Sequence, residues 1–332
     1  MNDVSQIIYF FGAGISNDAD LPMMIELWNK FQNYINAGNS EVDKDIKQNV
    51  KIIEKIVIIL YKEINIEYFL KVILDLEDNI ERKKIQKLDD CTNEINYDKL
   101  KMTRRITEKF IRLELEQVNI EKLHLYKPIL SLPPISYDKL KIFTLNYDGI
   151  LEILCEKNGR SFSDGFTISW DHHNFDNADI QIFKMHGSLF WLSTSNNNYI
   201  KIPLKGLDLS SIKYMSDDDL SEMIIYPSLN KYKFTEIYSW LNNKLIEELN
   251  NSWICIIVEY SLRDLDIREI FANALNSNKK LWIVLVSPNA LQRKNDFIKG
   301  NSFDKETSSR IVTLNAKFDI ISKKELMVKL NC

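Results

Sequence analysis

The stretch "IIYFFGAGISNDADLP" (residues 7–22) joins an apolar run to a short glycine loop. A continuous apolar run that ends at two glycines is typical of a buried parallel strand followed by a sharp turn. The dinucleotide-binding fingerprint G-x-G-x-x-G would need a third glycine where this chain has Asn17. The loop therefore does not indicate an ordinary Rossmann dehydrogenase.

Further apolar runs rich in Ile, Val and Phe predict additional strands. They are "KIFTL" (141–145), "IQIFKM" (180–185), "WICIIV" (253–258) and "LWIVLV" (281–286). Runs without polar alternation suit a parallel sheet that is covered on both faces. Helical patterns follow the last two runs, so we predict an α/β fold built on a Rossmann-like parallel sheet. Ligands of such sheets bind at the carboxyl ends of the strands, where the polar loops converge.

A long segment without strand patterns separates the first two predicted strands. In residues 23–128 Pro and Gly are nearly absent, and apolar residues recur at helical spacing. We predict a helical insertion or cap over 23–128, and a Rossmann-like domain formed by 1–22 and 129–332. Three prolines after residue 127 end the helices and mark the return to the sheet. A second polar stretch, roughly 193–219, predicts a surface excursion.

Composition and charge exclude several classes of protein. The net charge is −4, and acids and bases are mixed along the chain, so we expect no direct contact with nucleic acid. The four cysteines are far apart, which predicts no zinc or redox centre and favours a reduced, cytoplasmic location. The apolar runs are too short for a membrane span, and the first residues lack a secretory pattern. We expect a protein without a membrane segment.

Two loops carry the first candidate binding residues. Gly12, Ala13, Gly14 and Ser16 form "GAGIS", where backbone amides and a hydroxyl are suited to a pyrophosphate and a ribose. A tight turn with no ligand is the alternative. Asn146 and Asp148 follow a predicted strand in "TLNYD", where an amide can hold a ribose hydroxyl or a water. The alternative for Asp148 is a helix cap.

Two further loops follow predicted strands. His186 in "KMHGS" is suited to accept a proton from a sugar hydroxyl or water, although a lone histidine is often structural. Ser261 and Arg263 in "EYSLRD" are suited to bind phosphate or ribose oxygens, and a helix cap at Ser261 or Asp264 is the alternative. The pair His172 and His173 follows an aspartate, but no further ligand spacing supports a metal site there, and we expect no metal.

The order "GAGIS", "TLNYD", "KMHGS" and "VEYSLRD" resembles the sirtuin (SIR2) family, and more closely the bacterial SIR2-like domains of anti-phage defence. The resemblance spans most of the chain. It implies a sirtuin fold that takes NAD+ as its substrate. The glycine loop and Ser16 would contact the phosphates and ribose, Asn146 and Asp148 would lie beside the nicotinamide ribose, His186 would be the catalytic histidine, and Ser261 would lie near the adenosine side.

The departures from the family pattern are equally informative. Sirtuin deacylases carry a four-cysteine zinc module and a Phe-Arg pair after the glycine loop, whereas this insertion has only Cys91 and the loop continues as "LPMM". The resemblance therefore implies no zinc module and an NAD+ hydrolase that releases nicotinamide and ADP-ribose. Related domains often read "GYS" where this chain has Glu259, Tyr260 and Ser261, which leaves the backbone contact there open.

The resemblance also bears on biology and on alternative functions. It implies an NAD-depleting effector of abortive infection, regulated by homo-oligomerisation or by a co-encoded partner such as a HerA-type ATPase or a short Argonaute. Two alternatives stay open. One is an NAD-dependent deacylase or ADP-ribosyltransferase, and the other is a module that senses NAD or ADP-ribose without cleaving it.

Overall fold

The computed structural model describes residues 7–38, 41–87, 90–132, 139–194, 198–202, 220–224 and 235–317. The chain forms two compact units. The first contains Met1–Asp20, Val118–Ile224 and Tyr232–Cys332, and the second contains Leu21–Gln117 and Ile225–Lys231. The division of the sequence at 22 and 129 into two domains stays a prediction.

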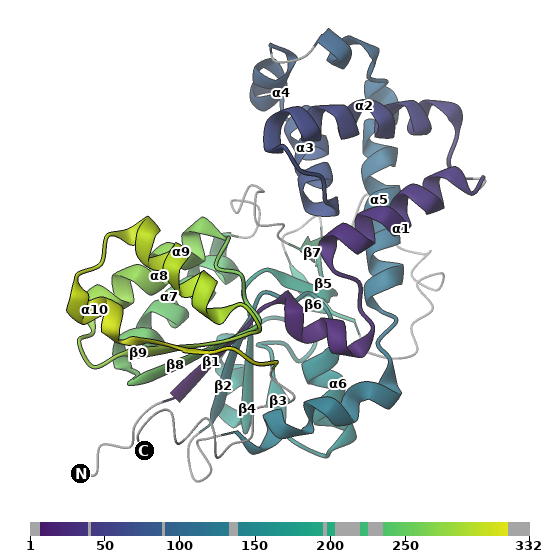
Figure 1. Cartoon of the computed structure of the whole chain (residues 1–332). Helices are drawn as coiled ribbons and strands as arrows, with labels where there is room; N and C mark the ends of the chain where they lie inside the picture. The colour runs from purple at the N-terminus through teal and green to yellow at the C-terminus, as the bar shows by residue number, and fades with distance from the viewer. Residues whose placement is uncertain are drawn as a thin grey trace. The chain divides into compact units, whose positions relative to one another are not determined.

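A seven-stranded sheet forms the centre of the first unit (Figure 1). Neighbouring strands in this sheet pair in parallel. In spatial order the strands are β10 (Ile311–Leu314), β9 (Trp282–Val286), β8 (Ile254–Val258), β1 (Ile7–Phe11), β2 (Leu140–Thr144), β4 (Ile180–Lys184) and β3 (Phe162–Ser163). From β1 the chain forms β2, β3 and β4 on one side and then β8, β9 and β10 on the other, so the topological switch point lies between β1 and β8.

Burial explains why these runs become parallel strands. All residues of β1, β4 and β8 are buried, so both faces of the sheet are covered by other elements. The five strands predicted from apolar runs are confirmed to within one residue at each end, and with them the Rossmann-like α/β fold. The short β3 and the edge strand β10 were not predicted, because two to four residues carry too little periodicity.

Helices connect the strands of the first unit. The α-helices are α6 (Ile150–Lys157), α7 (Thr235–Asn251), α8 (Leu265–Ser277), α9 (Ala290–Asn301) and α10 (Lys305–Ser309). The 3-10 helices are η1 (Ala13–Ala19), η4 (Ile120–Ser131) and η5 (His172–Asn177). The predicted helices after β8 and β9 are confirmed as α8 and α9. The glycine loop enters the 3-10 helix η1, and no α-helix begins there.

A three-stranded antiparallel sheet follows β4. It is formed by β6 (Tyr199–Lys201), β5 (Gly187–Thr194) and β7 (Leu220–Ile224), in that order. Much of this region was predicted to be an irregular surface excursion over roughly 193–219. That expectation was wrong for β6, while residues 195–197 and 203–219 lie outside the described residues. The short β6 pairs with β5, and such tertiary pairing is invisible to local pattern.

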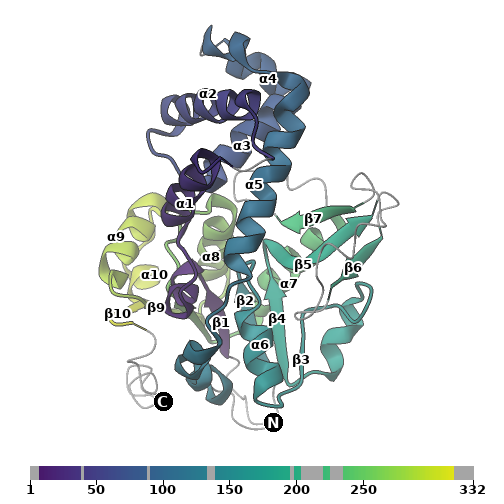
Figure 2. The same cartoon turned by 90° about the vertical axis from the view of Figure 1, so that its right-hand side faces the viewer.

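Helices make up the described part of the second unit (Figure 2). They are α1 (Met24–Asn36), α2 (Lys44–Tyr61), α3 (Ile66–Glu77), α4 (Asn79–Gln86), η2 (Asp90–Glu94), η3 (Tyr97–Lys99) and α5 (Leu100–Leu115). An aromatic cluster lies in its core, where the rings of Phe31 and Phe69 are 5.6 Å apart and those of Phe31 and Phe110 are 5.3 Å apart. The helical character predicted for this segment is confirmed.

None of the helices in the described parts of the chain is long and apolar enough to cross a membrane.

Candidate active site

The glycine loop packs against the loop that follows β8. The amide of Gly12 donates to the carbonyl of Val258 at 2.9 Å, and that of Gly14 donates to the carbonyl of Glu259 at 3.3 Å. A Cβ on Gly12 would lie 2.5 Å from the Tyr260 Cα, and one on Gly14 would lie 2.9 Å from the Glu259 Cβ. Close packing therefore explains why both positions are glycine, without any ligand.

Three predicted polar residues lie together at the ends of β1 and β2. The Ser16 hydroxyl donates to Asp148 Oδ2 at 2.6 Å, and Asn146 Nδ2 donates to Ser16 Oγ at 2.8 Å. The direction is fixed because a carboxylate can only accept. Residues 130 and 132 positions apart thus form one chain of hydrogen bonds beside the glycine loop.

The Asn146 amide leaves one buried acceptor without a partner. Its Nδ2 also lies 3.2 Å from the carbonyl oxygen of Gly12, which can only accept, so the amide nitrogen must face Gly12. The opposite atom, Oδ1, is buried and has no hydrogen-bond partner among the described residues. An unsatisfied buried acceptor costs about 1–3 kcal/mol, so such an atom in a native site needs an explanation such as a ligand or a water.

Asp148 combines a structural contact with a contact in the site. The N-cap residue of α6 is Gly149, but Asp148 Oδ1 accepts from the Ile150 amide at 3.0 Å and so satisfies one amide at that helix start. Its Oδ2 accepts from Ser16. A contact with the helix start and a role in the site are therefore compatible for this residue.

A buried ion pair lies next to this cluster. Lys184 Nζ lies 2.7 Å from Glu152 Oε1, and each side chain is 1% exposed. The same ammonium donates to the backbone carbonyl of Asp148. The pair thus ties the last residue of β4 to the first turn of α6 and fixes the backbone that carries Asp148.

The space between these side chains is small. A cavity of about 10 Å³ is lined by Ser16, Asn146, Asp148 and their neighbours, and its lining includes Tyr126. A single water needs about 10–15 Å³. Tyr126 donates to the carbonyl of Ile15 at 2.5 Å, and burial together with nearby Asp18 and Asp148 raises its pKa well above the usual range. The tyrosine is therefore a neutral donor, and a larger ligand requires this cluster to open.

His186 lies at the turn between β4 and β5, where it is buried. Its ring is 6.4 Å from that of Tyr147, and the carbonyl of Tyr147 accepts from the Leu189 amide at 3.0 Å. The next residue, Gly187, has φ of +83°, and a Cβ there would lie 1.8 Å from the Met223 carbonyl oxygen. Only glycine fits this turn, which fixes the backbone of His186.

The structure brings His186 together with Asp264 from the loop after β8. His186 Nε2 lies 3.1 Å from Asp264 Oδ2, and each side chain is 4% exposed. The orientation departs from hydrogen-bond geometry, so the contact is a close approach between ring nitrogen and carboxylate rather than an aligned bond. Asp264 Oδ1 caps α8 by accepting from the Asp266 and Ile267 amides at 3.0 and 3.2 Å. The cap that the sequence left open is therefore Asp264.

The rest of the "EYSLRD" loop is strained and partly exposed. Glu259 has φ of 50° and Leu262 has φ of 57°, both in the left-handed region. This explains why glycine suits the position of Glu259, whose carbonyl nevertheless accepts from Gly14. The side chains of Ser261 and Arg263 are exposed, so neither joins the buried cluster.

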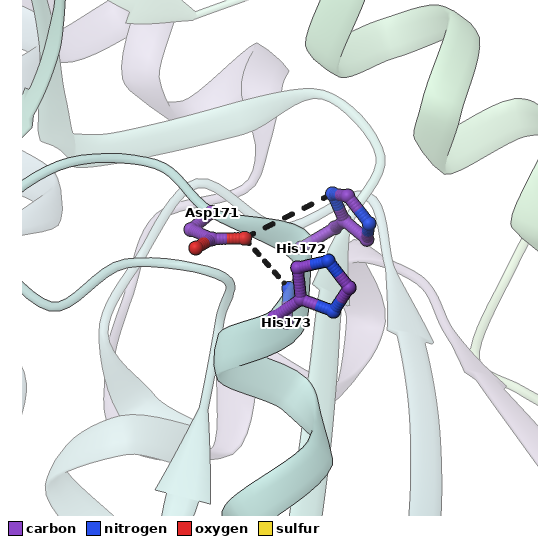
Figure 3. A group of neighbouring side chains, drawn as sticks. All are labelled: Asp171, His172 and His173. Atoms are coloured by element: carbon purple, nitrogen blue, oxygen red, sulfur yellow. Dashed lines mark hydrogen bonds and ion pairs between the residues drawn. The ribbon is translucent and has the colours of Figure 1, made fainter.

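Asp171, His172 and His173 lie elsewhere on the same unit (Figure 3). Their ligand atoms lie within 4.8 Å of one another, but the side chains are 54%, 49% and 72% exposed. Asp171 Oδ1 already accepts from the His173 amide at 2.9 Å. The two histidines line a cleft of about 500 Å³ near the amino ends of β2 and β4, away from the predicted site.

Neither the contact between Asp264 and His186 nor the ion pair between Lys184 and Glu152 was predicted from the sequence. A signal for the pair was present, because Lys184 lies in the largely apolar run "IQIFKM" and Glu152 lies within the apolar stretch "ILEIL". Charged side chains are almost never fully buried unless they are paired. No signal in the sequence pairs residues 186 and 264.

None of the curated proteins matches the chain significantly. Among solved structures, a Sir2 homologue in complex with NAD is 10% identical with a TM-score of 0.47, and the match covers 99% of this chain and 91% of that one. A Sir2 homologue variant in complex with ADP-ribose is 12% identical with a TM-score of 0.48, covering 99% and 93%.

The family model described as "SIR2-like domain" matches residues 140–305, which is half of the 332-residue chain. The match includes "TLNYD", "KMHGS" and "EYSLRD", the loops that hold Asn146, His186 and Asp264. The chain belongs to the SIR2-like family.

Proposed function

We propose that this protein is an NAD+ hydrolase that cleaves the bond between nicotinamide and ribose. Membership of the SIR2-like family supports NAD+ as the substrate. The observation that carries the proposal is the buried Asn146 Oδ1, an acceptor without a described partner at the carboxyl end of β2. Ligands of open parallel sheets bind at that edge, next to the switch point.

The loops around the cluster supply the other contacts to the substrate. In this proposal the amide of Ala13 faces the phosphates, and Ser16 contacts a ribose hydroxyl. The exposed Ser261 and Arg263 take the adenosine side and a phosphate. The chain carries a net charge of −4, so binding of an anionic substrate depends on these local donors.

The reaction begins with departure of nicotinamide. The bond between ribose C1′ and the pyridinium nitrogen breaks, its electron pair leaves with neutral nicotinamide, and positive charge develops on the ribose. Asn146 Oδ1 accepts from a ribose hydroxyl or from the attacking water and so orients it. The Asp148 carboxylate holds Ser16 and stabilises the positive charge nearby.

Capture by water completes the reaction. A water oxygen bonds to C1′ and loses a proton to His186, which yields ADP-ribose. General-base catalysis of this kind contributes about 10²–10⁴-fold. The cavity of about 10 Å³ implies that the contact between Ser16 and Asn146 opens before a ribose enters.

A product assay tests the proposal against its alternatives. Purified protein is incubated with NAD+, with and without an acylated peptide or an acceptor protein, and nicotinamide, ADP-ribose and cyclic ADP-ribose are quantified. The proposal predicts nicotinamide and ADP-ribose in equal amounts without an acceptor. Strict dependence on an acceptor would indicate a deacylase or transferase, and binding without nicotinamide release would indicate a sensor.

We also propose a cellular role in anti-phage defence by NAD+ depletion. An enzyme that consumes NAD+ continuously would harm its own cytoplasm, so its activity must be controlled. Homo-oligomerisation or a co-encoded partner, such as a HerA-type ATPase or a short Argonaute, would provide that control. Measurement of cellular NAD+ after infection, with the parent and with His186→Ala, tests this role, and equal NAD+ loss would contradict it.

A further inference from the structure

His186 and Asp264 come from two loops that the proposed chemistry does not connect. We propose that Asp264 is a positioning residue that holds the His186 proton on Nε2 and leaves Nδ1 as the atom that accepts a proton. The inference rests on the proposed function for its role in catalysis. Its structural part, the location of the proton, does not depend on any substrate.

The geometry favours one tautomer of His186. A neutral imidazole carries a proton on one nitrogen and a lone pair on the other. Nε2 lies 3.1 Å from Asp264 Oδ2, and both side chains are 4% exposed. A lone pair on Nε2 would face a carboxylate oxygen in a site that water does not screen, which is repulsive. The proton therefore belongs on Nε2.

Asp264 is suited to this task because its other oxygen is anchored. Oδ1 accepts from the amides of Asp266 and Ile267, which fixes the carboxylate at the start of α8. The positive end of the helix dipole also stabilises the negative charge there. A carboxylate held in this way stays in place as the imidazole becomes charged.

Opposite charges then stabilise the protonated ring. When His186 takes a proton from the attacking water at Nδ1, the ring becomes an imidazolium with its Nε2–H beside the Asp264 carboxylate. The proton count balances, because one proton leaves the water and one arrives on Nδ1. Asp264 neither gains nor loses a proton.

The first test reads the tautomer directly. Long-range ¹H–¹⁵N NMR spectra of protein labelled at its four histidines distinguish protonation at Nε2 from protonation at Nδ1. His186→Ala assigns the signal. The proposal predicts an Nε2–H tautomer in the parent protein and a mixture of tautomers in Asp264→Asn. An Nδ1–H tautomer in the parent would overturn it, whether or not the protein cleaves NAD+.

The second test uses a matched pair of variants. Asp264→Asn removes the charge but keeps an oxygen that can cap α8. Asp266→Asn removes the same charge in the same turn, at an exposed position. We expect Asp264→Asn to lower kcat by about 10-fold or more with KM within about twofold, and Asp266→Asn to leave both unchanged.

The outcomes separate the two proposals. If the parent cleaves NAD+ and Asp264→Asn does so at the parent kcat, the role of Asp264 is overturned while the hydrolase proposal stands. If the parent does not cleave NAD+, the hydrolase proposal fails, and the tautomer alone decides the inference. If Asp264→Asn does not fold, the parent spectrum still decides it.

Discussion

Two aspartates at the carboxyl edge of the sheet make similar contacts, although they lie in loops that follow different strands. Asp148 follows β2 and Asp264 follows β8. Each uses Oδ1 to accept from backbone amides at a helix start and Oδ2 to contact a side chain from another strand connection. The contacted groups differ: Ser16 is a neutral donor, whereas His186 changes charge when it takes a proton.

A carboxylate can contact a helix start and another side chain at the same time. An aspartate has two oxygens, and a helix end needs only one of them. The second oxygen is then held in a fixed place at no further conformational cost. In the Asp148 region this oxygen accepts from Ser16 and orders a chain of hydrogen bonds, and in the Asp264 region it lies beside an imidazole nitrogen.

We expect the greatest loss of stability when the buried ion pair between Lys184 and Glu152, next to Asp148, is broken. Lys184→Met removes one member of the buried pair and leaves the Glu152 carboxylate without compensation, since both side chains are 1% exposed. We expect a loss of about 3–5 kcal/mol in the free energy of unfolding, measured by urea denaturation. The double variant Lys184→Met with Glu152→Leu should recover most of this loss.

The matched control for this prediction is an exposed ion pair. Lys109 lies 2.8 Å from Glu41, and the two side chains are 52% and 51% exposed. Lys109→Met should change the unfolding free energy by less than about 1 kcal/mol. Equal losses for Lys184→Met and Lys109→Met would show that the buried pair does not stabilise the Asp148 backbone.

A second, smaller effect is expected on the His186 side. Gly187→Ala places a Cβ at φ of +83° and 1.8 Å from a backbone oxygen, whereas Gly159→Ala places one at φ of +61° in open space. Left-handed backbone costs a non-glycine residue about 1–2 kcal/mol, which is the loss expected for Gly159→Ala. Gly187→Ala should lose more than this, measured by thermal unfolding, and a smaller loss would contradict the fixed turn.

The weakest effect that we expect is on the reactivity of two buried cysteines, one in the helix after Asp148 and one in the strand before Asp264. Cys155 lies in α6 after Asp148, and Cys255 lies in β8 before Asp264. Burial raises the pKa of Cys155 to about 12 and that of Cys255 further. At pH 7 both remain thiols, so we expect neither to react with iodoacetamide in the native protein, as mass spectrometry would show.

In the variant Lys184→Met, Cys155 should react with iodoacetamide before Cys255. Equal rates for the two cysteines would indicate that the Asp148 region does not open locally.

Much of the fold was predictable from the sequence, because buried parallel strands leave continuous apolar runs. The runs at β1, β2, β4, β8 and β9 are of this kind. The short β6 was not predictable, since three residues form a strand only through pairing with β5. The glycine loop leads into the 3-10 helix η1 and packs closely against Tyr260, and no local pattern encodes that contact.

The candidate site was predictable in its members but not in its contacts. Strand ends identified Asn146, Asp148 and His186 because parallel strands expose their loops at one edge. Whether the Asn146 oxygen lacks a partner depends on which atom of the side-chain amide faces Gly12. The residue that contacts His186 is Asp264, which lies 78 positions further along the chain. Such pairings follow from tertiary structure and have no sequence spacing of their own.

We propose that the Asn146 oxygen, which has no described partner, and the buried His186 act on NAD+. Nicotinamide release from NAD+ is measured for the parent, Asn146→Ala, His186→Ala and, as a control, His173→Ala, whose side chain is 72% exposed. We expect release by the parent and by His173→Ala at similar rates, and a loss of about 100-fold or more in the other two variants. Release at the parent rate by folded Asn146→Ala or His186→Ala would contradict it.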